Sequence, residues 1–175
     1  MLAYLFVLIA VALRLLPHPL AFTPVGAALL YFGARGSRKM LWVPLALLAA
    51  SDVYLTIARY GYSLPADQFV TWAWYAAVIV IGGGVLRRNS RPLALGAAAV
   101  ATSVSFFLVS NFAVWAVWPT YPKTLSGLAA CYVAGIPFFR NDLAGNLFFT
   151  AVLFAVPMAI EALRPGASRD HIRAA

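Results

Sequence analysis

The chain has 175 residues, of which 63% are hydrophobic and 10% are charged, with a mean hydropathy of +0.86. Soluble domains carry about 25% charged residues, so this composition excludes a soluble core and predicts an integral membrane protein. The net charge of +8 would suggest a nucleic-acid partner in a soluble protein. Here the basic residues fall mostly in short loops between apolar runs, where they report topology, and we expect no nucleic-acid partner.

Six apolar runs are candidates for membrane spans, each of which needs about 17–25 mostly apolar residues. They lack the alternation of outer-membrane barrels, so the predicted fold class is all-α and the architecture a polytopic helical bundle. Arg14 interrupts the first run and no basic segment precedes it, which favours a first span over a cleaved signal peptide. In chain order the predicted spans cover residues 1–16, 20–34, 40–58, 68–86, 93–118 and 143–163.

Segment 124–139 lies between the fifth and sixth predicted spans and is harder to interpret. It has Pro137 near its end and would make a short span, so we favour a partial, re-entrant or surface-lying segment over a seventh crossing. With six spans, most basic residues share one face, and the positive-inside rule places both termini in the cytoplasm. That face holds Arg35, Arg38, Lys39, Arg87, Arg88, Arg91, Arg164, Arg169 and Arg173. Residues 1–164 then form one transmembrane domain, and residues 165–175 form a polar cytoplasmic tail.

Polar residues inside the predicted spans gather in the outer half of this topology. Ionisable groups in a membrane are costly, and they are usually paired or face a cavity. The Asp52 carboxylate could bind a ligand, hold Arg14 or Arg140 in place, or anchor the bundle by hydrogen bonds. Arg14 could instead reach towards the outer interface. The amides of Asn111 and Asn146 could contact a ligand or join neighbouring helices.

Aromatic residues are also concentrated near the outer face, where they could form an interfacial belt or the walls of a stacking pocket. The candidates for such walls are Trp115, Trp118, Tyr121 and Tyr132. The triplet at 82–84, three consecutive glycines, is interpreted as a site of close helix packing, because it lacks the context of a phosphate loop. His18, His171 and Cys131 have no metal-ligand spacing, and no catalytic pair is present, so we expect no metal, no cofactor and no enzyme activity.

Three stretches resemble a family of small bacterial membrane proteins classed as transport proteins, which are similar to the S components of energy-coupling factor (ECF) vitamin transporters. They are "HPLAFTPVGAALLYFGA" (18–34), "VPLALLAASDVYL" (43–55) and the block from Ser110 to Ala155. Ala21 departs from the asparagine expected before Phe-Thr-Pro in that family. The resemblance implies a six-helix protein of the bacterial inner membrane, with an outward ligand site under the loop after the first span. It also implies a cytoplasmic side that docks an ECF-type coupling module of a membrane subunit and ATPases, although some similar proteins work without one.

Our leading hypothesis is a substrate-binding subunit for uptake of a small vitamin-like or cofactor-precursor molecule. The alternative is a structural or assembly subunit of a larger membrane complex with no ligand of its own, and an enclosed polar and aromatic cavity would favour the first over the second. The candidate substrate-binding residues are Arg14, His18, Phe22, Thr23, Asp52, Asn111, Trp115, Trp118, Tyr121, Tyr132, Arg140 and Asn146.

Overall fold

The computed structural model describes residues 1–16 and 21–162, and every regular element in these residues is helical. His18, the basic residues after position 162 and the predicted tail therefore lie outside the described residues. The helices are α1 (Leu2–Leu15), α2 (Val25–Arg35), α3 (Trp42–Val53), α4 (Asp67–Ile81), α5 (Pro92–Val117) and α6 (Leu125–Ala162). A 3₁₀ turn, η1 (Arg38–Met40), precedes α3, and π-helical turns extend α3 and α4 as η2 (Tyr54–Arg59) and η3 (Gly82–Leu86).

Three helical segments in the described part of the chain are long and apolar enough to cross a membrane. They are Arg38–Arg59, Asp67–Leu86 and Pro92–Val117, and they match the predicted spans 40–58, 68–86 and 93–118. Most of their residues are not buried inside the bundle, as expected for helices that face lipid. These segments bear out the prediction of an all-α protein with membrane-spanning helices.

The first two predicted spans are shorter than expected. At 1.5 Å per residue, α1 with 14 residues is about 21 Å long and α2 with 11 residues is about 16 Å long. Neither length reaches across a hydrocarbon core of about 30 Å. The predicted full span at 20–34 is therefore not confirmed, since the regular helix in this run begins only after Pro24.

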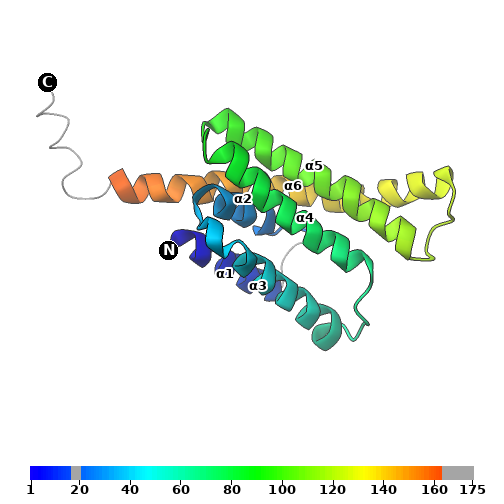
Figure 1. Ribbon diagram of the computed structural model, residues 1–175. Coiled ribbons are helices and arrows are strands. Elements are labelled where there is room, and N and C mark those ends of the chain that lie inside the picture. Colours follow the sequence, from blue (N-terminus) through cyan, green and yellow to red (C-terminus); the bar gives the residue numbers. More distant parts are fainter. Residues whose placement is uncertain (17–20, 163–175) are drawn as a thin grey trace, which may run out of the picture.

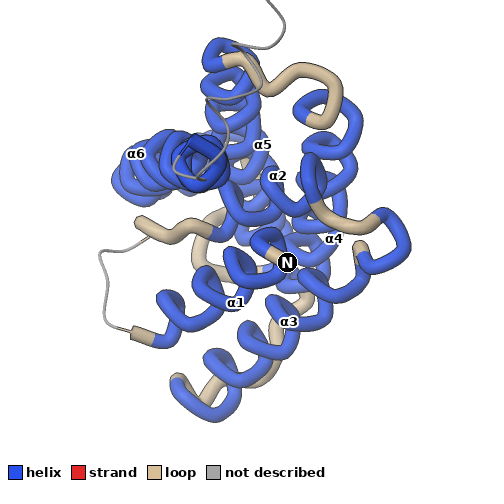
Figure 2. Tube along the Cα trace, turned by 90° about the vertical axis from the view of Figure 1, so that its left-hand side faces the viewer, coloured by secondary structure: helices blue, strands red, loops and turns tan. Residues whose placement is uncertain are grey.

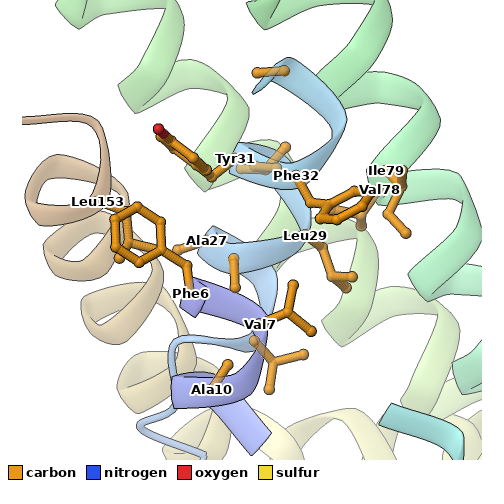
Figure 3. Close-up of a cluster of buried hydrophobic side chains, with 14 of the residues drawn as sticks. Phe6, Val7, Ala10, Ala27, Leu29, Tyr31, Phe32, Val78, Ile79 and Leu153 are labelled. Atoms are coloured by element: carbon orange, nitrogen blue, oxygen red, sulfur yellow. The ribbon is translucent and has the colours of Figure 1, made fainter. Parts of the chain in front are cut away.

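Helix α2 lies in the middle of the bundle, where it contacts α1, α4, α5 and α6 (Figure 2). All residues from Val25 to Ala34 are buried. Side chains from three neighbouring helices pack on it, including Phe6 and Val7 of α1 and Leu153 of α6 (Figure 3). The ring of Tyr31 lies 4.8 Å from that of Phe6, in an edge-to-face arrangement. A helix that is apolar on all sides is thus explained by its central position.

Close packing of α2 against the end of α4 depends on glycines. A Cβ at Gly82 would lie 2.5 Å from the carbonyl oxygen of Leu30, and one at Gly83 would lie 3.2 Å from the carbonyl oxygen of Gly33. Gly84 has no atom within 4 Å of the same position. The prediction of close helix packing at the glycine triplet is therefore confirmed for its first two members.

Helix α6 is continuous where the sequence predicted a break before the last span. Segment 124–139 is not a separate re-entrant piece, because one helix of 38 residues runs from Leu125 to Ala162 with Pro137 inside it. A proline in a helix removes one backbone hydrogen bond, a loss that helices in membrane proteins tolerate. The helix would be about 57 Å long if straight, which exceeds the hydrocarbon core, and it packs along the antiparallel α5 (Figure 1).

Basic residues of two turns lie at the same end of the bundle, the end near the N-terminus (Figure 1). The exposed cations of these turns are Arg35, Arg38, Lys39, Arg87, Arg88 and Arg91. Arg87 also donates to the carbonyl oxygens of Gly33 and Gly36, at 3.1 and 2.9 Å, and so satisfies the C-terminal end of α2. This arrangement agrees with the charge pattern from which the cytoplasmic face was predicted, while the orientation itself stays a prediction.

Candidate functional site

A cavity of about 330 Å³ lies among the ends of α1, α2, α3 and α4 and the middle of α5 and α6. We call it the Arg14–Asp52 cavity, after the two charged residues that line one side of it. It lies away from the basic turns, because Asp52 is near the end of α3 remote from the α2–α3 turn (Figure 1). Its lining residues are Arg14, Ala21, Thr23, Val25, Gly26, Asp52, Leu55, Thr56, Tyr60, Gln68, Trp74, Tyr75, Phe106 and Asp142.

Asp52 is the centre of a hydrogen-bond network that joins three helices. Its side chain is 5% exposed and forms an ion pair with Arg14 of α1 through Oδ1. Its other carboxylate oxygen accepts from Gln68 Nε2 at 3.0 Å and from Trp72 Nε1 at 2.9 Å, both on α4. The sequence left open whether Asp52 pairs with Arg14 or with Arg140. The structure selects Arg14, and Arg140 is exposed on α6.

The Arg14 guanidinium has further partners besides the carboxylate. One of its nitrogens donates to the hydroxyl of Ser51 at 3.2 Å and to that of Tyr75 at 3.4 Å. Ser51 in turn donates to the carbonyl oxygen of Leu48 at 2.7 Å. Arg14 is only 16% exposed, so it does not extend to an interface as an isolated snorkelling side chain would. A charge pair with this many hydrogen bonds is held in one geometry.

Helix α4 supplies polar residues that our list of candidates did not include. Gln68, Trp72 and Tyr75 follow each other at positions i, i+4 and i+7, which places them on one face of a helix. All three direct a polar atom to the Arg14–Asp52 pair. Their spacing was visible in the sequence, but the aromatic residues were left open between an interfacial belt and the walls of a pocket, and Gln68 was taken as the first residue of a span.

The opposite wall of the cavity comes from α6 and carries a second carboxylate. Asp142 accepts a hydrogen bond from Asn146 Nδ2 at 3.2 Å, and the same nitrogen lies 2.7 Å from the hydroxyl of Ser103 on α5. Asn146 is fully buried and fills the space beside Gly26, where a Cβ would collide with its amide. The candidate Asn146 therefore lies behind the cavity wall and positions Asp142, rather than lining the cavity itself.

Asn111 lines a smaller neighbouring cavity of about 40 Å³, together with Phe107, Phe138 and other residues of α5 and α6. Its amide donates to the carbonyl oxygen of Phe107 at 2.8 Å. Asp142 and Phe106 line both cavities, so the two adjoin each other. Asn111 is thus near the candidate site but belongs to the joint between α5 and α6.

The predicted aromatic walls lie elsewhere, near the α5–α6 turn. Trp115 donates to the carbonyl oxygen of Pro122 at 2.9 Å, and Trp118 donates to Asp67 at 3.1 Å. Tyr132 donates to the carbonyl oxygen of Leu108 at 2.7 Å. Neither these three nor Tyr121 lines the Arg14–Asp52 cavity. The aromatic residues that do so are Tyr60, Trp74, Tyr75 and Phe106.

The segment before α2 forms part of the cavity wall. Thr23 lines the cavity, whereas the ring of Phe22 packs 5.4 Å from that of Phe149 on α6. Ala21 has a φ of 61°, in the left-handed region that a residue with a Cβ rarely occupies. The asparagine expected there from the family resemblance would tolerate this conformation better.

Among the residues that the structure describes, no group of three or more His, Cys, Asp or Glu side chains could hold a metal ion. Cys131 is buried at the α5–α6 contact, with its sulfur 3.4 Å from the carbonyl oxygen of Asn111. What the site offers is an ion pair, a second carboxylate, hydroxyl and amide groups, and aromatic faces around a common space. These are features of a small-molecule binding site.

Comparison with known proteins identifies the family. Residues 1–167 match the model of DUF6580, a family of unknown function, and the chain belongs to this family. No curated protein and no solved structure shows significant similarity to the chain.

Proposed function

We propose that this member of the DUF6580 family is a membrane transport protein that captures a small vitamin-like or cofactor-precursor molecule in the Arg14–Asp52 cavity. The observation that carries the proposal is the cavity itself. A volume of about 330 Å³ is at the lower end of the range for ligand sites, and convergent polar groups with aromatic walls are typical of them. A dry, closely packed bundle would instead have favoured the assembly-subunit alternative.

The arrangement of the network supports binding over a purely structural role. Four polar side chains from α3 and α4 converge on one carboxylate–guanidinium pair, yet that pair borders an open space rather than a filled core. Burying charges costs free energy, and well-packed apolar residues often stabilise a bundle as well or better. A role in forming a ligand site therefore explains a pre-organised charge pair beside a cavity better than a purely structural role does.

The proposal also specifies how the protein is oriented in the membrane and where the energy for uptake comes from. Asp52 lines the cavity and lies near the end of α3 remote from the basic turns, so with those turns in the cytoplasm of a bacterial inner membrane, the cavity would receive its ligand from outside. The sequence has no ATPase motif, so uptake would be driven from elsewhere, for example by an ECF-type coupling module docked at the basic end. Release would follow from reorientation or gating of the bundle.

A cavity-filling variant tests the proposal. Thr56 lines the cavity, and Thr56→Phe would occupy part of it, whereas Ala58→Phe adds the same side chain at an exposed position two residues later. Small molecules extracted from each purified protein are to be identified by mass spectrometry. We expect one compound to accompany the wild-type protein and Ala58→Phe and to be lost from Thr56→Phe. Equal retention by both variants, or no small molecule in any preparation, would contradict the proposal.

A further inference from the structure

The charges around the Arg14–Asp52 cavity indicate the charge of the ligand, which the proposed function leaves unspecified. Among the described lining residues, one side chain is cationic, Arg14, and two are anionic, Asp52 and Asp142. The formal charge of this lining is therefore −1, although the chain as a whole carries +8. A negative cavity in a strongly basic protein calls for a specific explanation.

The two carboxylates are not equivalent. Both oxygens of Asp52 are occupied, one by Arg14 and the other by Gln68 and Trp72. Asp52 thus accepts three hydrogen bonds, close to the about four that a carboxylate can accept, and its charge is already balanced by Arg14. Asp52 and Arg14 therefore form a neutral, internally satisfied unit that shapes the cavity.

Asp142 faces the same space, and no described residue forms an ion pair with it. The structure shows one ion pair in the described part of the chain, between Arg14 and Asp52, and Asp142 takes no part in it. Its hydrogen bonds come from neutral groups, with Asn146 donating to one carboxylate oxygen. A neutral donor such as the Asn146 amide orients a carboxylate but does not neutralise it, so Asp142 has the capacity to bind a cation.

The aromatic walls of the cavity are also suited to a cation. Trp74, Tyr75, Phe106 and Tyr60 line the cavity, and the rings of Trp74 and Phe106 lie 4.6 Å apart. A ring face attracts an ammonium group placed within about 6 Å of its centroid, and the attraction is larger where water is excluded. The same faces accept the apolar body of an organic molecule.

We infer that the cavity selects a small organic cation, a molecule with one ammonium group and an apolar or aromatic body, and that Asp142 is its counter-ion. This inference rests on the proposed function and specifies its substrate class. The ammonium group would lie between Asp142 and the aromatic walls. The Arg14–Asp52 unit, with no net charge, would border the rest of the ligand.

Three probes with the same aromatic body and different charges test the inference. They are 2-phenylethylamine, 2-phenylethanol and phenylacetate, each titrated into the purified full chain in detergent at neutral pH and low salt. We expect the amine to bind at least about tenfold more tightly than the alcohol and the acid, from the charge-assisted contact and the ring faces. Equal or tighter binding of phenylacetate, or no measurable binding of the amine, would overturn the inference.

Matched variants assign the effect to one residue. Asp142→Asn keeps the size of the side chain and removes its charge, while Asp67→Asn makes the same change at a residue outside the cavity, where Asp67 accepts from Trp118. We expect Asp142→Asn to weaken binding of the amine at least about tenfold, to leave binding of the alcohol within about twofold, and to unfold at a similar temperature. Unchanged amine binding in Asp142→Asn would refute the role of Asp142.

The outcome for the natural ligand separates the two proposals. A neutral or anionic compound that co-purifies with the wild-type protein and is lost from Thr56→Phe would overturn the inference and leave the proposed function standing. A co-purifying amine lost from the same variant would support both. The absence of any such compound, together with no binding of the three probes, would overturn both.

Discussion

Removing Asp52 tests whether the charge pair is buried and mutually dependent. The variant Asp52→Ala leaves the Arg14 guanidinium, whose side chain is 16% exposed, with only the hydroxyls of Ser51 and Tyr75 as hydrogen-bond partners. It also leaves the donors of Gln68 and Trp72 without their shared acceptor. Breaking a buried ion pair by removing one partner costs about 3–5 kcal/mol in proteins, chiefly because the other charge stays buried alone.

The stability losses from substituting Arg14 and Asp52 should not add up in the double variant. Arg14→Met leaves the Asp52 carboxylate unpaired, and we expect a similar loss of about 3–5 kcal/mol in the free energy of unfolding. The double variant has no unpaired charge, only neutral polar groups beside a cavity large enough for water. It should therefore lose less stability than either single variant, with a coupling free energy of at least about 2 kcal/mol.

The assay is reversible unfolding of the purified protein in mixed micelles, followed by circular dichroism, for the wild type, both single variants and the double variant. Arg59→Met is the control, since Arg59 is an exposed cation at the end of η2 and its loss should change stability by less than about 0.5 kcal/mol. Additive losses in the double variant, or a loss below about 1 kcal/mol for Asp52→Ala, would refute the reasoning.

Three further predictions concern the packing and the backbone. Gly82→Ala should lower the free energy of unfolding by at least about 1 kcal/mol, because its Cβ would meet the backbone of α2. Gly84→Ala should be neutral or slightly stabilising, and equal effects of the two variants in thermal unfolding would argue against the close packing. Ala21→Gly should raise the unfolding temperature, with a gain in the free energy of unfolding below about 1 kcal/mol. Glycine relieves the strain of the left-handed conformation, and this gain exceeds the entropic cost of ordering a more flexible residue; a lower unfolding temperature would contradict this. Cys131 should react slowly with a maleimide in detergent, since it is 2% exposed. The exposed position 126 provides the control: Ser126→Cys in a Cys131→Ala background should react much faster, and comparable rates would show that the α5–α6 contact is open.

The sequence was sufficient to predict the fold class and the long helices. Continuous apolar runs at 40–58, 68–86 and 93–118 have one plausible structure in a bilayer, because a helix satisfies all its own backbone groups. At two places the sequence was less informative, for separate physical reasons. Run length alone does not distinguish a lipid-facing span from a short helix buried by its neighbours, as in α2, and Pro137 does not end a helix that α5 supports along its length.

The candidate site was predicted in part. Arg14 and Asp52 were identifiable as costly charges in apolar runs, but the sequence left open whether Asp52 pairs with Arg14 or with Arg140, and the structure shows Arg14. Trp115 and Trp118 were grouped with them because all were expected near the outer face, but sharing a depth in the membrane does not place side chains in contact. The partners on α4 depend on the rotation of that helix about its axis, which a single sequence does not define, although the spacing of Gln68 and Trp72 was a usable signal.

The most direct test of the central claim, that the Arg14–Asp52 cavity holds a small molecule, is native mass spectrometry of the detergent-solubilised protein. We predict a wild-type species heavier than the polypeptide by the mass of one small molecule, released at low collision energy, and its absence from Thr56→Phe but not from Ala58→Phe. A wild-type spectrum with only the bare polypeptide and lipid adducts, identical to that of Thr56→Phe, would contradict the account.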